Sequence, residues 1–392
     1  MKTHEAAITG IGCISPLGFC PGELSATLRD GHSAIAAIER FDTGAYSCRF
    51  GAEVKGFELA EFIESKKTYL DRTSAFALAA CAMALKEAHW QGDESVGLLL
   101  GTAWGCMDSL ELFAEKLVGG NPKFVSPLPF THSYANAPNS LVAIEFKLRG
   151  FSACFTCGHT SGMTAIECAC QRIELGRATR LLAGGCEALS EPVFHGYDLR
   201  GLLNGAGEPR PYDLGSDGTV LGEGAAVFAL EQAEAAEARQ ATIFARLRGH
   251  ASACGEGLAD GLARSMRGAL EHAGMEPREV DLVMGAACGL PELDGAELEA
   301  VRAVFGEARP MVTSARRMLG EGMGAGGPLS LAAALIACLE DRAVPPVVLG
   351  DMPVPEAIDL VVGDHRPADV ATVLVNAADP GGACTSLLLG LT

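Results

Sequence analysis

The sequence predicts an α/β fold in which two similar halves form a five-layered αβαβα arrangement. Short apolar runs that are ended by turn residues, such as 96–101 and 225–231, are typical of buried strands. The helix expected over 73–89 is rich in alanine and apolar nearly all round, which favours a helix that is enclosed by other elements. Past residue 231 the alternation of helices and strands restarts. Alternation of this kind, with fully apolar strands, indicates parallel or mixed sheets that are covered by helices on both faces.

The expected elements follow in order along the chain. In the first half we expect strands at 6–11, 96–101, 152–157, 180–185 and 225–231, and helices at 73–89, 140–148 and 162–175. In the second half we expect helices at 259–274, 292–306 and 327–341, and strands at 280–287, 311–314, 360–363, 371–377 and 386–391. No low-complexity linker separates the halves, so we expect residues 1–240 and 241–392 to pack as one body.

The overall charge and the cysteine pattern exclude several classes of protein. The chain has 30 Lys and Arg against 49 Asp and Glu, a net charge of −19, whereas nucleic-acid binding needs a basic face. It has neither a basic N-terminal segment before a long apolar core nor an uninterrupted apolar run of about 18 residues, so no signal peptide and no membrane span are expected. The 14 cysteines are scattered, and Cys154 and Cys157 form a lone CxxC. This pattern predicts reduced thiols in a cytoplasmic protein, without a metal site or cofactor.

Three stretches carry a resemblance to a known family. They are AITGIGCISPLG near the N-terminus, ELGRATRLLAGGCEA in the middle, and RPYDLGSDGTVLGEGAAVFALE from Arg210 to Glu231. In this order they resemble the β-ketoacyl-acyl carrier protein synthases of the thiolase superfamily, and the resemblance runs collinearly from about residue 5 to 391. It implies a thiolase-like fold of two pseudo-repeated halves.

The family's catalytic positions can be located by counting from these stretches. The nucleophilic cysteine of the family falls on His159, in the strand–turn–helix segment ACFTCGHTSG. Counting back from Asp294 and Glu297 places the first catalytic histidine on Ala286. The second falls on Glu321. The family's lysine falls on Arg316 and the phenylalanine of its gating loop on Pro380, so no catalytic residue of the family is intact.

These replacements remove the chemistry of condensation. Claisen condensation needs a thiolate to carry the acyl chain and two imidazoles to bind the malonyl carbonyl as it becomes an enolate. Ala286 offers no side-chain donor, and an ionised Glu321 would repel the developing oxyanion. At a helix N-terminus the imidazole of His159 is expected to be neutral, because the helix dipole disfavours its cation.

The combination of a retained scaffold and a dismantled site resembles the chain-length factors of type II polyketide and polyene synthases. In that family the silent subunit forms a heterodimer with an active ketosynthase, and an acyl carrier protein delivers acyl and malonyl thioesters. The resemblance implies an interface at residues 152–157 and 105–148. Candidate tunnel-lining residues are Met107, Leu110, Leu112, Phe113, Cys157 and Pro380. Chain-length factors commonly carry glutamine where this chain has His159.

Two other readings of the sequence remain open. The chain could be a thioester hydrolase, acyltransferase or decarboxylase that uses His159 together with Glu321. It could also be a homodimeric acyl-binding protein without a ketosynthase partner. Arg316 is expected to pair with Glu321 or Asp294, and Cys288 and Cys384 are expected to be small core residues.

Overall fold

The centre of the fold is a sheet of eleven strands in the order β12-β10-β9-β14-β15-β8-β1-β7-β6-β4-β5. The structure is a computed structural model and describes residues 4–350 and 357–392. The strands of the N-terminal part are β1 (Ala6–Ile14), β4 (Gly97–Gly101), β5 (Ser152–Phe155), β6 (Arg180–Glu187) and β7 (Gly224–Gln232). Those of the C-terminal part are β8 (Ala245–Ala253), β9 (Leu282–Met284), β10 (Met311–Thr313), β12 (Asp359–Leu360), β14 (Thr372–Ala378) and β15 (Cys384–Leu391).

The two parts of the sheet have the same topology. The order β1-β7-β6-β4-β5 in the N-terminal part recurs as β8-β15-β14-β9-β10 in the C-terminal part. Strand β1 joins them, because it pairs along its length with β7 but only over Ala6–Ile8 with β8. The repeated order explains why the sequence pattern restarts after residue 231. The division of the chain at residue 240 remains a prediction.

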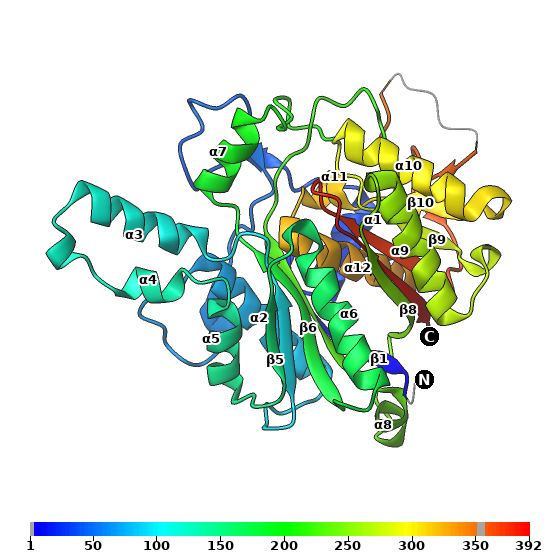
Figure 1. Cartoon of the computed structure of the whole chain (residues 1–392), viewed down its shortest axis with the longest axis horizontal. Helices are drawn as coiled ribbons and strands as arrows, with labels where there is room; N and C mark the ends of the chain where they lie inside the picture. Colours follow the sequence, from blue (N-terminus) through cyan, green and yellow to red (C-terminus); the bar gives the residue numbers. More distant parts are fainter. Residues whose placement is uncertain (1–3, 351–356) are drawn as a thin grey trace.

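Helices complete the five layers (Figure 1). Helices α2 (Arg72–Glu87) and α5 (Ala137–Phe146) pack together, with α2 against β1 and β7. Helices α9 (Leu258–Ala273) and α10 (Pro291–Phe305) also pack together, with α9 against β8 and β15. Helices α6 (Ser161–Glu174) and α12 (Gly326–Ile336) contact each other and strands of both parts. The predicted αβαβα fold is therefore confirmed.

The central helix α12 is buried at every position. Within the described part of the chain, the segment Met323–Asp341 that contains it is long and apolar enough to cross a membrane, but 89% of it is buried inside the fold. An apolar surface on all sides is what a helix between two sheets needs. Its composition is therefore explained by the core of the protein.

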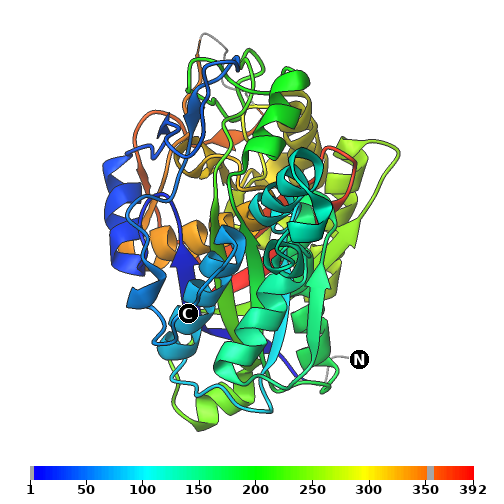
Figure 2. The same cartoon turned by 90° about the vertical axis from the view of Figure 1, so that its left-hand side faces the viewer.

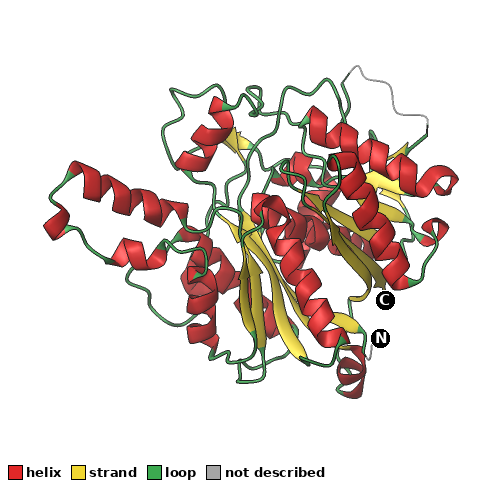
Figure 3. Cartoon of the chain, viewed as in Figure 1, coloured by secondary structure: helices red, strands yellow, loops and turns green. Residues whose placement is uncertain are grey.

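Further helices lie around these layers, as Figure 3 shows. They are α1 (Pro21–Asp30), α3 (Met107–Gly119), α4 (Leu128–His132), α7 (Glu191–Leu199), α8 (Ala233–Ala238) and α11 (Arg316–Leu319). Helices α3 and α4 project from the body of the molecule, and Figure 2 views them from their own side. Their surface is rich in exposed apolar side chains: Leu110, Leu117, Val118, Phe124, Leu128 and Phe130.

Candidate functional site

His159 lies in the turn that the sequence predicted, between β5 and α6. The residues Gly158–Thr160 form a single 3₁₀ turn, and the positive φ of Gly158, +68°, favours glycine at its start. The His159 side chain is buried, with 4% of its surface exposed. Its Nε2 lies 2.7 Å from the hydroxyl of Tyr197 on α7, and its Nδ1 lies 3.6 Å from Oε1 of Glu321. The nucleophile position therefore holds an imidazole with a polar neighbour at each ring nitrogen.

Glu321 is neutralised by Arg316. The two side chains are buried and form an ion pair, so Glu321 is the partner of Arg316 and Asp294 is not. Oε1 of Glu321 also accepts a hydrogen bond from the backbone N–H of Met323 at 2.8 Å. The two charges compensate each other, as a buried ion pair requires, but the Nε and Nη2 atoms of Arg316 make no hydrogen bond within the described residues. The pair thus consists of the two residues that the sequence predicted at the positions of the family's lysine and second catalytic histidine.

Asp379 approaches the same turn from the loop between β14 and β15. Its Oδ2 accepts a hydrogen bond from the backbone N–H of His159 at 2.9 Å. A Cβ atom at Gly158 would lie 2.0 Å from this oxygen, so the carboxylate packs directly on the turn. Backbone N–H groups at the start of a helix are the donors that stabilise an oxyanion. Here the carboxylate of Asp379 accepts the hydrogen bond of the His159 N–H group, so this donor is not available to an oxyanion.

The loop that contains Ala286 is held by two carboxylates of α10. Glu297 accepts hydrogen bonds from the backbone N–H groups of Ala286 and Ala287, and Asp294 accepts them from Cys288 and Gly289, all at 2.9 Å. The strand predicted over 280–287 is therefore too long: β9 ends at Met284, because side chains and not a neighbouring strand satisfy the loop that follows. Burial raises the pKa of Asp294 to about 7. Ala286 presents no polar side chain here.

Burial sets the protonation of the His159 cluster. It lowers the pKa of His159 from its ordinary value of 6.5 to about 4, Asp379 opposes the shift, and Arg316 adds to it. Burial also raises the pKa of Tyr197. The imidazole is therefore neutral at pH 7, as the sequence predicted, but desolvation is the main cause. With the ring proton on Nδ1, Nε2 accepts the hydrogen bond of the Tyr197 hydroxyl, while Nδ1 makes no hydrogen bond, because Oε1 of Glu321 is 3.6 Å away.

Two cavities lie beside this cluster. One of about 380 Å³ is lined by Trp104, Met107, Pro192, Val193, Gly196, Tyr197, Arg200 and Leu202. The other, of about 620 Å³, is lined by Leu202, Leu258, Leu290, Leu293, Pro380, Gly381 and their neighbours, including Glu256 and Glu292. Leu202 borders both. Tyr197 belongs to the wall of the smaller cavity and contacts His159, yet nothing in the sequence marked it.

The tunnel-lining candidates are dispersed between these cavities and the surface. Met107 lines the smaller cavity and Pro380 the larger one. Leu110 is 41% exposed on α3, and Phe113 contacts Phe130 of α4 with a ring-centroid distance of 5.0 Å. Cys157 is exposed, with its thiol 3.6 Å from the hydroxyl of Thr164. Cys288 and Cys384 are buried, as expected of core residues.

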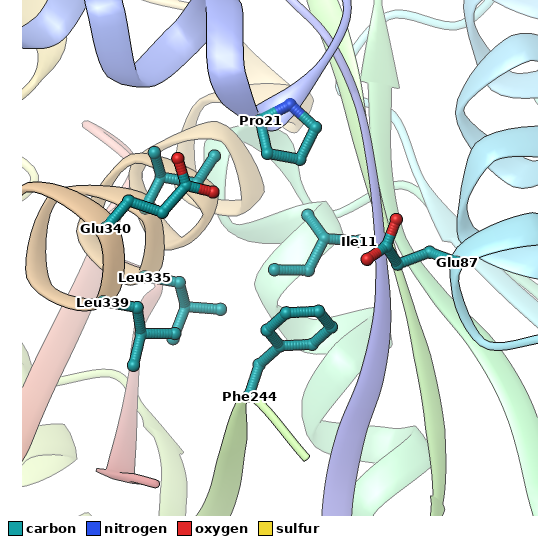
Figure 4. Close-up of a pocket in the computed structure, with 8 residues that line it drawn as sticks. Ile11, Pro21, Glu87, Phe244, Leu335, Leu339 and Glu340 are labelled. Carbon is teal, nitrogen blue, oxygen red and sulfur yellow. The ribbon is translucent and has the colours of Figure 1, made fainter. Parts of the chain in front are cut away.

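A further small pocket, of about 80 Å³, lies elsewhere in the molecule (Figure 4). Ile11, Phe244, Leu335 and Leu339 form its apolar walls, with Glu87 and Glu340 at its sides. It contains none of the predicted site residues.

Comparisons with known proteins place the chain in a family. The β-ketoacyl synthase N-terminal domain matches residues 3–236, and the β-ketoacyl synthase C-terminal domain matches residues 244–350. The chain is 33% identical to the tetracenomycin polyketide synthase ketoacyl synthase beta subunit of Streptomyces glaucescens, over 97% of each chain. It is 30% identical to a 3-oxoacyl-(acyl-carrier-protein) synthase 2 of Synechocystis sp., again over 97% of each chain.

Among solved structures, the ishigamide ketosynthase/chain length factor superposes on this chain with a TM-score of 0.93, at 29% identity and over 99% of each chain. Relatives of both kinds, ordinary synthases and a polyketide synthase beta subunit, are therefore similar along nearly the whole chain. The chain belongs to the β-ketoacyl synthase family and has its thiolase-like fold.

Proposed function

We propose that this protein is a chain-length factor, a non-catalytic subunit that pairs with an active ketosynthase and shapes the tunnel for the growing acyl chain. The observation that carries the proposal is the buried cluster around His159. The ring of His159 is neutral, its backbone N–H is bound by Asp379, and Glu321 is paired with Arg316. An acyl carrier protein with an acyl or malonyl thioester is the proposed donor of substrate to the assembled pair.

This cluster does not support condensation. The ring of His159 replaces the thiolate, Ala286 removes one oxyanion donor, and Glu321 removes the other. Loss of a single oxyanion donor costs about 3–4 kcal/mol of transition-state stabilisation. In addition, the carboxylate of Asp379 lies where an oxyanion would need a donor. A thioester bound here would meet negative charge instead of hydrogen-bond donors.

The surface beside the cluster supports pairing with a second subunit. Strand β5 lies at one edge of the sheet, and among the described residues it pairs with β4 alone, so its outer edge is open to a further strand. The projecting segment from α3 to α4 adds exposed apolar side chains, among them Phe124 in the connecting turn Pro122–Phe124, at 84% exposure. An open strand edge next to an apolar patch is typical of a protein–protein interface. A ketosynthase partner would cover both.

The alternative of altered chemistry draws on the order Tyr197, His159, Glu321. In space, the hydroxyl of Tyr197, the imidazole of His159 and the carboxylate of Glu321 follow one another as the nucleophile, the base and the orienting carboxylate do in a catalytic triad. The electrostatics oppose this use, because burial makes His159 a weaker base and Tyr197 a weaker acid. The ion pair with Arg316 also removes the free charge of Glu321 that would stabilise an imidazolium. The third hypothesis, a homodimeric acyl-binding protein, differs from the proposed function in its oligomeric state when a ketosynthase is present.

Co-expression with an intact ketosynthase from the same genome tests the pairing. We expect a one-to-one complex that forms polyketide from acyl carrier protein thioesters, while this chain alone forms none. The activity should disappear when the ketosynthase cysteine is replaced by alanine and persist in the His159→Gln variant of this chain. The Phe124→Asp variant should abolish co-purification.

Leu214, 45% exposed and beside α10, supplies the matched control Leu214→Asp, which should leave the complex intact. A homodimer that does not co-purify with the ketosynthase would refute the pairing. Product formation by this chain alone would favour the hypothesis of an enzyme with altered chemistry.

Variants of the tunnel candidates test the control of product length. The Met107→Ala and Phe113→Ala substitutions enlarge the space near the proposed interface, so the complex should make products longer by at least one extension unit. Mass spectrometry of the products measures this, with Leu214→Ala as the control. Unchanged product lengths in a complex that still assembles would contradict a length-setting role for these residues.

The pH dependence of stability tests whether His159 is held neutral. Because its pKa in the folded state is about 4 against 6.5 ordinarily, the unfolded chain takes up this proton first as the pH falls. The contribution of His159 to stability is therefore full above pH 6.5 and is lost towards pH 4, by about 3 kcal/mol. Urea unfolding should show a steeper loss for the wild type than for His159→Gln, while carboxylates such as Asp294 affect both alike. Parallel curves would show that the histidine is not desolvated.

A further inference from the structure

A second cluster of ionisable side chains lies at the other end of α6. Glu174 on α6, His250 on β8 and His272 on α9 converge so that one potential ligand atom of each lies within 4.8 Å of the other two. Oε2 of Glu174 is 3.2 Å from Nε2 of His250 and 3.4 Å from Nε2 of His272. Glu174 and His250 are buried, with exposed fractions of 4% and 6%. The cluster contains none of the residues around His159.

We propose that Glu174, His250 and His272 bind a divalent transition-metal ion of the zinc class. Zinc bonds to imidazole nitrogen and carboxylate oxygen are about 2.0–2.2 Å long, so two ligands of a tetrahedral ion lie about 3.3 Å apart. The two distances from Glu174 match this separation. Two imidazoles and one carboxylate favour zinc over magnesium or calcium, which prefer oxygen ligands. Water would complete the coordination.

Glu167, about two helical turns before the end of α6, supports the cluster from outside. Its Oε1 is 3.5 Å from Nδ1 of His250, the ring nitrogen that faces away from Glu174. The hydroxyl of Ser252 and the side-chain amide of Gln171 donate hydrogen bonds to the Glu167 carboxylate. A carboxylate behind a histidine ligand orients the ring and increases its basicity, and this is the usual arrangement at metal sites. The charges of Glu167 and Glu174 together balance a divalent cation.

Two contacts must change when the ion binds. The hydrogen bond between Nε2 of His250 and Oε2 of Glu174 is replaced by a bond from each atom to the ion. The backbone N–H of His250 donates to Nδ1 of His272 at 3.3 Å, which places the proton of a neutral His272 ring on Nε2. Coordination through Nε2 moves this proton to Nδ1 and ends that hydrogen bond. His272 is 30% exposed near the end of α9, and a side chain with this exposure can make the adjustment.

The ion would connect elements of the two halves of the chain. Helix α6 belongs to the N-terminal part and starts directly after the turn of His159, whereas β8 and α9 belong to the C-terminal part. A metal at this place fixes α6 against both, so its role is structural. The sequence predicted no metal site, because 76 residues separate Glu174 from His250 and no short metal-binding spacing marks them.

Titration of the metal-free full-length chain with Zn²⁺ tests this site. Isothermal titration calorimetry should show one equivalent bound, and Co²⁺ in its place should give the visible absorption of a four-coordinate ion with nitrogen and oxygen ligands. Binding should raise the midpoint of thermal unfolding. Glu174→Gln and His272→Ala should abolish binding, and Glu167→Gln should weaken it by about 10–100-fold.

Exposed groups supply the controls. His32→Ala removes an exposed histidine outside the cluster and should change nothing. The thiols of Cys20, Cys157 and Cys254 are exposed and could bind zinc without the cluster. Binding that survives Glu174→Gln and His272→Ala, a Co²⁺ spectrum with thiolate bands, or no binding by the wild type would each overturn the proposal. Circular dichroism of each variant shows that it has folded.

Discussion

The contact on which the rest of this structure depends is the buried pairing of Arg316 with Glu321 beside His159. Arg316 compensates the charge of Glu321, and the neutral ring of His159 lies between Glu321 and Tyr197. Breaking a buried pair by removing one partner leaves an uncompensated charge, which costs about 3–5 kcal/mol. The pair therefore has to remain intact for the region around His159 to keep this arrangement.

This constraint separates two properties that active members of the family combine. The scaffold keeps its layers, its eleven-stranded sheet and the turn before α6. The chemistry depends on a few side chains at that turn and can be lost while the core stays packed. The proposed function depends instead on the surface, on the edge strand β5 and on the apolar side chains exposed between α3 and α4.

The sequence predicted the layers, because they depend on local pattern along the chain; its assignment of the family's catalytic positions to His159, Ala286 and Glu321 remains a prediction. It predicted the turn at His159, the absence of a side-chain donor at Ala286 and the pairing of Arg316. Contacts between distant segments could not be predicted in this way. Asp379 is 220 residues away from His159 along the chain, and no sequence motif indicates that its carboxylate binds the His159 backbone.

Tyr197 was missed for a similar reason. It lies 38 residues after His159 on α7, a helix that the sequence pattern did not single out. The strand expected to reach residue 287 ended early, because Glu297 and Asp294 hold the backbone from a neighbouring helix. The periodicity of the sequence indicates which faces of an element are apolar. It does not indicate where side chains, instead of a neighbouring strand, accept the backbone hydrogen bonds.

The central claim is that this chain holds no acyl group during synthesis. Intact-mass measurement of both subunits, after rapid acid quenching of the complex during turnover with acyl carrier protein thioesters, tests it most directly. We predict an acyl adduct on the ketosynthase subunit and an unmodified mass for this chain. A covalent acyl adduct on this chain, retained when the ketosynthase is left out, would contradict the account.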